Sequence, residues 1–284
     1  MLIAKTIKQA KKAISEAKLK NRTIGFVPTM GALHYGHLSL VRAARKSCDF
    51  VAVSIFVNPA QFGPKEDFRK YPRAFIRDER LLQKEKVDLI FYPSVAEMYP
   101  KDFSTYVEEI YLSKPLCGLI RPGHFRGVCT VVAKLFNIIE PDTAYFGQKD
   151  YQQACIIKRM VKDLNFPVTV KVVSTVREKD GLAMSSRNAY LNCQERKDAL
   201  VLFESIELAK KLVRGGGKNP KKIIAKMRKL ILSKKSAKID YIEIVDAQSL
   251  QKVDKMQKNV LIAIAVYIGK TRLIDNVIVH LKGS

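Results

Sequence analysis

Residues 26–40 read FVPTMGALHYGHLSL, and the rest of the chain is interpreted outward from this stretch. An apolar run over residues 24–27 ends at Pro28, a turn containing Gly31 follows, and an apolar-periodic segment opens at His37. This order predicts a buried strand, a loop and the start of a helix. Small loop residues let backbone N–H groups approach a ligand, and the first turn of a helix presents unpaired donors that suit phosphate.

His34 and His37 flank the same turn, and they are two of the four histidines in the chain. Taken alone, an H-x-G-H sequence is more often a surface turn with two solvated imidazoles. Here both follow the carboxyl end of a predicted buried strand, where open α/β sheets bind ligands. Zinc is the weaker interpretation, because no Cys or carboxylate lies nearby at ligand spacing and because Gly36 suits the close approach of backbone to phosphate.

Apolar segments alternate with helical patterns through the first part of the chain. Thr6 is a plausible N-cap for a first helix, and further helices are expected near residues 74–86, 127–139 and 151–164. Strands are expected at residues 24–27, 50–57, 89–92, 144–146 and 168–173. The alternation predicts an α/β fold with a Rossmann-like, doubly wound parallel sheet.

The pattern changes beyond residue 176, where a polar loop leads into a helix at residues 195–213, the breaker GGGKNP and a basic helix. Three strands follow, at residues 239–245, 260–267 and 273–280. A chain of 284 residues is long enough for two domains. We therefore expect a first domain over residues 1–176 and a smaller C-terminal α+β domain over residues 177–284.

Composition restricts the class of protein. The chain is 47% hydrophobic and 27% charged, and its longest apolar stretch, residues 260–268, is far shorter than the roughly 20 residues of a membrane helix. Its N-terminus has no signal-like apolar run, so a cytoplasmic location is expected. The five cysteines are scattered without a C-x-x-C, which favours neither a disulfide framework nor a zinc knuckle.

The net charge of +24 could indicate a polyanionic partner. Residues 210–238 contain 12 Lys or Arg and no acidic residue, yet an apolar stripe with helical spacing runs through the same region. We interpret this region as an amphipathic helix with a solvated basic face. Because no RNP-like aromatic stripe accompanies it, nucleic acid is not expected as a partner.

Three further stretches carry polar groups at positions where a ligand could bind. Asn58 and Gln61 follow a buried strand, and neutral amides suit a substrate with hydroxyls and a carboxylate. Lys149 follows another strand at a helix start, from which it can reach phosphate oxygens. Ser185, Ser186 and Arg187 sit in a loop after the sheet and offer the donors that a triphosphate needs.

Together these stretches resemble the paired ATP signatures of class I aminoacyl-tRNA synthetases and related nucleotidyltransferases. The chain more closely resembles the pantothenate synthetase family, whose motifs match in order from Thr23 to about Leu191. The matching segments are PTMGALHYGH, FVNPAQF with YPR, RPGHFRGV, FGQKDYQQ and REKDGLAMSSRNAYL. A nucleotidyltransferase making a dinucleotide is the alternative, but the amides at Asn58, Gln61 and Gln153 fit a small hydroxy acid better.

The resemblance implies an ATP-dependent ligase with two half-reactions. Pantoate would attack the α-phosphorus of Mg-ATP, giving pantoyl adenylate and pyrophosphate, and β-alanine would then displace AMP to form pantothenate. The C-terminal domain would act as a lid, and the protein would form a homodimer through its N-terminal domain.

The same resemblance assigns residues to roles. His37 would be the proton donor, with His34, Lys149 and Arg187 also in the catalytic set. Gln61 and Gln153 would hold pantoate, joined by Asn58, and Asp78 is the candidate Mg²⁺ ligand. Tyr71, Arg121 and His124 would line the β-alanine end or support the site from behind. The expected ATP contacts are Met30, Gly31, Ala32, Leu33, His34, Tyr35, Gly36, His37, Gly147, Gln148, Lys149, Asp150, Val176, Met184, Ser185, Ser186 and Arg187.

Overall fold

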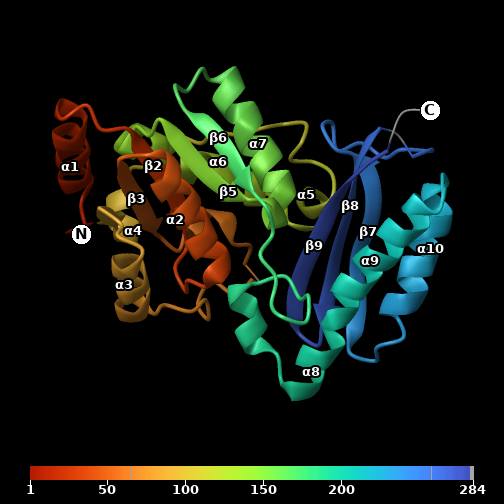
Figure 1. The fold of residues 1–284 in the computed structure, drawn as a ribbon. Helices are drawn as coiled ribbons and strands as arrows, with labels where there is room; N and C mark the ends of the chain where they lie inside the picture. Colours follow the sequence, from red (N-terminus) through yellow and green to blue (C-terminus); the bar gives the residue numbers. More distant parts are fainter. Residues whose placement is uncertain (65, 257, 282–284) are drawn as a thin grey trace. The chain divides into compact units, whose positions relative to one another are not determined.

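The computed structural model describes residues 1–64, 66–256 and 258–281. The chain divides into two compact units, Met1–Ser174 and Thr175–Ser284, which are described separately (Figure 1). The boundary lies two residues before the predicted one. Among the described residues, no helix is both long enough and apolar enough to cross a membrane.

The first unit is built on a six-stranded sheet in the order β1-β4-β3-β2-β5-β6, with every neighbouring pair parallel. The strands are β1 (Leu2–Ala4), β2 (Ile24–Thr29), β3 (Phe50–Ile55), β4 (Leu89–Phe91), β5 (Thr143–Gly147) and β6 (Thr169–Val173). From β2 the chain adds β3 and β4 in one direction and then β5 and β6 in the other, while β1 pairs with β4 at one end of the sheet. The order therefore reverses between β2 and β5, and ligands bind at the carboxyl edge beside such a reversal.

Helices cover both faces of this sheet, so the predicted doubly wound α/β fold is confirmed. Helices α2 and α3 share one apolar cluster on the sheet, whereas α6 packs against both α1 and α7. The helices are α1 (Ile7–Leu19), α2 (Tyr35–Ser47), α3 (Phe75–Lys84), α4 (Val95–Met98), α5 (Cys117–Ile120), α6 (His124–Ile139) and α7 (Tyr151–Asp163). Two 3-10 turns, η1 (Pro59–Gln61) and η2 (Gln148–Asp150), follow β3 and β5.

The predicted strands differ from the observed ones in several bounds; for example, β3 ends at Ile55 rather than at residue 57. Two further differences have a clear cause. Strand β2 continues through Pro28 to Thr29, where it still pairs with β3. Proline is tolerated there because the pairing of β2 with β5 ends at Phe26, so no hydrogen bond to β5 is lost at Pro28. Strand β1 was not predicted, since it has only three residues and two of them are exposed. The predicted cap of α1 is confirmed: the Thr6 side chain accepts from the Gln9 N–H, and the Gln9 side chain caps in return.

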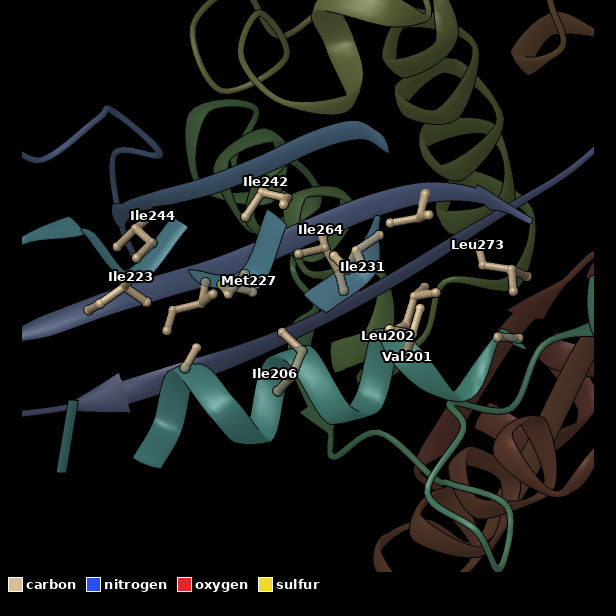
Figure 2. Close-up of a cluster of buried hydrophobic side chains, with 14 of the residues drawn as sticks. Val201, Leu202, Ile206, Ile223, Met227, Ile231, Ile242, Ile244, Ile264 and Leu273 are labelled. Carbon is tan, nitrogen blue, oxygen red and sulfur yellow. The ribbon is translucent and has the colours of Figure 1, made fainter. Parts of the chain in front are cut away.

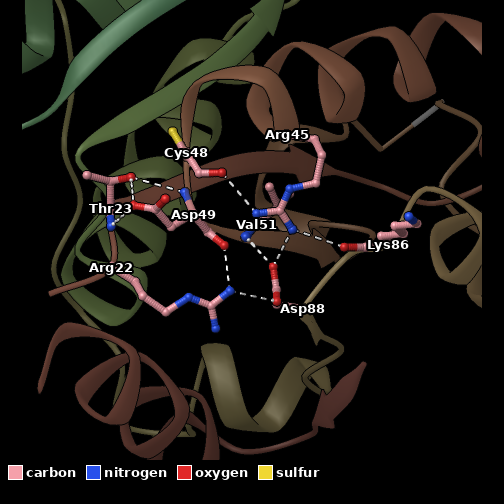
Figure 3. Close-up of polar contacts among 8 residues, drawn as sticks. All are labelled: Arg22, Thr23, Arg45, Cys48, Asp49, Val51, Lys86 and Asp88. Carbon is pink, nitrogen blue, oxygen red and sulfur yellow. Dashed lines mark hydrogen bonds and ion pairs between the residues drawn. The ribbon is translucent and has the colours of Figure 1, made fainter. Parts of the chain in front are cut away.

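A carboxylate network fixes the amino edge of the same sheet (Figure 3). Asp88 accepts from Arg45 at 2.6 Å, from Arg22 at 3.2 Å and from the Val51 N–H at 2.8 Å. Asp49 likewise accepts from the backbone and the hydroxyl of Thr23. These bonds join the starts of β2, β3 and β4, so this edge stabilises the fold while the opposite edge is left for a ligand.

The second unit is an α+β arrangement, as predicted. Its antiparallel sheet has the order β7-β8-β9, formed by β7 (Ala237–Asp246), β8 (Asn259–Ile268) and β9 (Thr271–His280). Helices α9 (Leu200–Arg214) and α10 (Pro220–Ile231) pack on it through buried side chains that include Ile206, Met227 and Ile264 (Figure 2). The turn η3 (Ser186–Tyr190) and helix α8 (Cys193–Asp198) precede them, so the single helix expected over residues 195–213 is interrupted at Ala199.

The basic segment is an amphipathic helix, as predicted. Ile223, Met227 and Ile231 of α10 are buried in the core of the second unit, whereas Lys222 and Lys226 are exposed. The helix is therefore held by its apolar stripe and presents its charges to solvent.

Candidate active site

The turn after β2 has an uncommon backbone. Gly31 and Ala32 both adopt positive φ, at 80° and 51°. The N–H groups of Ala32 and Leu33 donate to the two carboxylate oxygens of Asp78, at 2.7 and 2.8 Å. The sequence predicted that the N–H groups of this turn face a ligand, but these two bind a carboxylate of the same chain.

The two histidines form the start of α2. The Nδ1 atom of His34 accepts from the Gly36 N–H at 3.1 Å, and the Nδ1 atom of His37 accepts from the His34 N–H at 3.3 Å. Their ring centroids lie 4.1 Å apart. The helix begins at Tyr35, two residues earlier than predicted, because imidazole nitrogens supply the capping contacts that Ser or Asp usually make.

These contacts assign the tautomer of each neutral ring. An Nδ1 atom that accepts a hydrogen bond carries no proton, so the proton lies on Nε2. The pKa of His37 is well below its usual range, first because the ring is buried and then because His34 and Lys149 lie near it. At neutral pH the His37 ring is therefore an uncharged Nε2–H donor.

Lys149 adds a cation on the neighbouring strand. It lies in η2, directly after β5, and β5 pairs with β2 at the reversal of strand order. Its Nζ atom is 3.8 Å from the Asp150 carboxylate. A Cβ atom at Gly147 would meet nothing within 4 Å, so the end of β5 faces open space. The imidazoles and this ammonium group thus share the carboxyl edge of two adjacent strands.

The amides after β3 differ in what they can offer a ligand. Asn58 is only 1% exposed, and its side chain donates to Gln61 Oε1 at 3.0 Å and to the Gly127 carbonyl at 3.1 Å. Its oxygen accepts from the Tyr99 hydroxyl at 2.8 Å and from the Ala60 N–H. These contacts engage the Asn58 amide in holding Gln61. Contact of Asn58 with substrate stays a prediction.

Gln61 is half-buried and lies beside the first turn. Its Nε2 atom lies 3.2 Å from the sulfur of Met30. Helix α6 packs directly on η1 because Gly127 has no side chain; a Cβ there would lie 2.1 Å from the Ala60 carbonyl oxygen. The sequence analysis did not identify this glycine, although its position in RPGHFRGV was a usable signal.

A chain of hydrogen bonds between charged and polar side chains supports the backbone of Gln61. Glu66 receives two 2.6 Å bonds from Arg121, which also donates to His124 Nε2 at 3.0 Å, and His124 Nδ1 donates to the Gln61 carbonyl at 2.8 Å. Burial, followed by the charge of Arg121, lowers the pKa of His124 to about 4. The sequence left two roles open for Arg121 and His124, which were lining the β-alanine end of the site or supporting other site residues. These contacts favour the supporting role. Tyr71 is buried with its ring against Phe62.

Two adjacent glutamines on α7 have different environments. Gln152 is buried and binds the 112–117 loop through the Cys117 N–H and the carbonyls of Leu112 and Pro115. Gln153 is half-buried. Of the pair, Gln153 is therefore the one that stays a candidate for substrate binding.

The 184–187 loop belongs to the second unit. The Met184 N–H donates to the Val176 carbonyl at 3.0 Å, and Ser185 Oγ accepts from the Arg187 N–H at 3.2 Å. Asn188 ties the loop to Glu178 at 2.8 Å and to the Ala183 carbonyl at 3.1 Å. The Ser185 side chain therefore fixes the backbone at Arg187. The Val176 carbonyl holds the backbone at Met184.

Among residues 1–64, 66–256 and 258–281, no group of three or more His, Cys, Asp or Glu side chains forms a metal-binding cluster. Asp78, the predicted Mg²⁺ ligand, uses both oxygens on backbone N–H groups. The structure thus gives Asp78 a structural role, and Mg²⁺ binding by this residue stays a prediction.

Comparison with known proteins identifies the family of the chain. The family model described as pantoate-beta-alanine ligase matches residues 2–278. The chain belongs to this ligase family. Relatives named pantothenate synthetase include one from Thermotoga neapolitana, 58% identical over 98% of this chain and 99% of the relative. Another, from Fervidobacterium nodosum, is 57% identical over 99% of this chain and its own full length.

Solved structures of ligases from this family have the same fold. The pantothenate synthetase of Thermus thermophilus superposes with a TM-score of 0.93 at 44% identity, covering 98% of this chain and 99% of that one. The pantoate-beta-alanine ligase of Francisella tularensis, crystallised with beta-gamma ATP and beta-alanine, gives a TM-score of 0.81 at 38% identity. That match covers 98% of this chain and 97% of the Francisella chain.

Proposed function

We propose that this chain uses ATP to condense pantoate with β-alanine, forming pantothenate, AMP and pyrophosphate through a pantoyl adenylate. The observation that carries the proposal is the grouping of His34, His37, Lys149 and Gln61 around the strand reversal. Phosphate donors and a neutral amide at one edge match a triphosphate beside a small hydroxy acid. Membership of the ligase family gives the substrates.

The first half-reaction requires positive charge and donors more than a base. A carboxylate is ionised at neutral pH, so pantoate needs no deprotonation before it attacks the α-phosphorus. Attack of an anion on a polyanion is opposed by repulsion, which Lys149 and the His37 Nε2–H would reduce as charge shifts to the leaving pyrophosphate. We expect Mg²⁺ to enter with the nucleotide, held by phosphate oxygens and water.

Pantoate would lie between the Gln61 and Gln153 amides, which can donate to its carboxylate and accept from its hydroxyls. Asn58 would act by orienting Gln61, and Arg121 and His124 by fixing the Gln61 backbone. β-Alanine would then attack the acyl carbon as a neutral amine, with Gln61 bordering its position.

Four assignments stay predictions. Met184, Ser185, Ser186 and Arg187, with the Val176 main chain, are proposed to contribute to ATP binding. The second unit is proposed to act as a lid. We also expect a homodimer and a cytoplasmic location.

The deciding experiment measures AMP release from Mg-ATP with purified protein. AMP should form in amounts equal to pantothenate, and its formation should require both pantoate and β-alanine. Pyrophosphate–ATP isotope exchange should require pantoate alone. AMP release without pantoate, or exchange without it, would refute the proposed reaction.

A further inference from the structure

Asp78 is a buried carboxylate whose contacts the proposed chemistry does not explain. It lies in the first turn of α3 and is 1% exposed. Its partners, the N–H groups of Ala32 and Leu33, belong to the turn that precedes α2, more than 40 residues earlier in the chain. Burying a carboxylate is unfavourable unless hydrogen bonds compensate it, so this pairing requires a reason.

The geometry of the turn gives that reason. Successive N–H groups in a turn that contains left-handed residues form a concavity that binds anions. Here the positive φ angles at Gly31 and Ala32 turn the next N–H groups inward, and the bound anion is the Asp78 carboxylate. The concavity is therefore filled by the protein itself. The N–H groups of His34 and Gly36 are engaged by the capping imidazoles, so ATP phosphate would be received by side-chain donors such as the His37 Nε2–H.

The surroundings show how the turn depends on this carboxylate. Leu33 is 1% exposed and packs in the apolar cluster under α2, so one end of the turn is anchored by packing. On the other side, Met30, Gly31 and Asp78 line a cavity of about 480 Å³ that also borders Phe75 and Tyr92. Packing on this side is incomplete. The two hydrogen bonds to Asp78 therefore hold the positive φ of Ala32, a backbone conformation that is energetically unfavourable for a residue with a side chain.

We propose that Asp78 is a positioning residue for ATP binding, an internal anion that holds the 31–33 turn so that the His34 and His37 imidazoles face the phosphates. The proposal rests on the proposed function, and it replaces the predicted role of Asp78 as a Mg²⁺ ligand. An asparagine at this position would keep the shape of the side chain, but its NH₂ group would face one of the two backbone N–H groups. Two hydrogen-bond donors would then oppose each other, and one of the two hydrogen bonds would be lost.

The test compares three variants with the wild-type protein. Asp78→Asn removes the anion; Gly31→Ala keeps it but displaces the turn, because a Cβ there would lie 3.0 Å from Asp78 Oδ2 at a φ of +80°. Glu79→Gln makes the same chemical change at the next residue of α3 and is the matched control. Each protein is assayed by pyrophosphate–ATP exchange as a function of ATP and of free Mg²⁺, by calorimetric ATP binding, and by thermal unfolding.

Asp78→Asn and Gly31→Ala should both weaken ATP binding by about tenfold to a hundredfold, in line with the effect of small displacements at a site. The Mg²⁺ concentration for half-activation, measured at saturating ATP, should stay at the wild-type value. Glu79→Gln should behave as wild type. A merely structural role would lower the unfolding temperature without changing the ATP dissociation constant of the folded fraction.

The proposal is overturned if Asp78→Asn binds ATP like the wild type, or if its Mg²⁺ requirement rises while that of Gly31→Ala does not. If Asp78→Asn does not fold, Gly31→Ala decides: weaker ATP binding supports the proposal and unchanged binding refutes it. A wild-type protein that makes no AMP would count against the proposed function instead, and the ATP dissociation constants would still decide the role of Asp78.

Discussion

The two loops predicted to bind ATP, one in each unit, are held in different ways. The loop at residues 29–37 is anchored by the buried Asp78 carboxylate and the buried Leu33 side chain, and two half-buried imidazoles cap the helix that follows. The loop at residues 184–190 depends on partly exposed contacts, such as Glu178 with Asn188 and Arg196. We therefore expect the first loop to be preformed. We expect the second to be held less firmly, so that part of the energy of ATP binding would be used to order it.

The largest effect is expected beside the preformed loop. Lys149→Ala should slow pyrophosphate–ATP exchange by about 10²–10³-fold, because a preorganised charge at developing negative charge is lost. The unfolding temperature should be unchanged. Lys158→Ala, an exposed lysine on α7, is the control and should keep wild-type exchange. Exchange at the wild-type rate in Lys149→Ala would remove this residue from the mechanism.

A smaller effect is expected in the second loop. Arg187→Ala should slow pyrophosphate–ATP exchange by about tenfold to a hundredfold. The loss is smaller because the free-energy cost of ordering this loop offsets part of the stabilisation that the guanidinium gives to the transition state. The comparison is with Arg214→Ala, at the exposed end of α9. A loss greater than that of Lys149→Ala would show that the second loop is as well organised as the first.

Acid should weaken the first unit through His124. Its folded pKa is about 4, below the unfolded value near 6.5, so its contribution to stability is complete above pH 6.5 and is lost as pH falls towards 4. The free energy of unfolding should drop by up to about 2 kcal/mol between pH 7 and pH 5 through this group. Urea unfolding of the wild type and of His124→Gln measures it. Identical pH dependence in the two proteins would contradict a neutral buried ring.

The smallest effect is expected for an exposed ion pair that lies outside both loops. Lys18 and Glu140 form an exposed ion pair at 2.7 Å, so Lys18→Ala should cost less than about 1 kcal/mol and should leave exchange unchanged. Urea unfolding at low salt and at high salt checks this. A larger loss would mean that exposed pairs, including those behind the 184–190 loop, are stronger than the comparison assumes.

The sequence predicted most of the sheet because β2 and β3 are buried on both faces and read as continuous apolar runs. The candidate site residues were chosen by their place after strands, and the structure brings the carboxyl ends of β2, β3 and β5 to one edge of the sheet. What each polar side chain contacts could not be predicted. Asn58 and Gln61 look equivalent in the sequence, but only the fold brings Tyr99 and Gly127 to Asn58.

The same limit explains Asp78. Its spacing after YPR suggested a site residue, and it does lie beside the turn, but its partners are 45 and 46 residues away. Backbone angles such as those of Ala32 depend on tertiary contacts, which local propensity does not report. The start of α2 was missed by two residues for a related reason, because imidazole caps are not among the usual N-cap signals.

The caps of α2 illustrate a trade-off between stability and activity. His34 and His37 satisfy the helix N-terminus without an acidic side chain in its first turn, so the positive end of the helix dipole is not neutralised there. An aspartate cap would strengthen the helix start but would repel a polyanionic nucleotide at the place where we propose that it binds. The helix therefore begins with weaker, uncharged caps, and in the proposed site the missing negative charge would be supplied by the bound nucleotide.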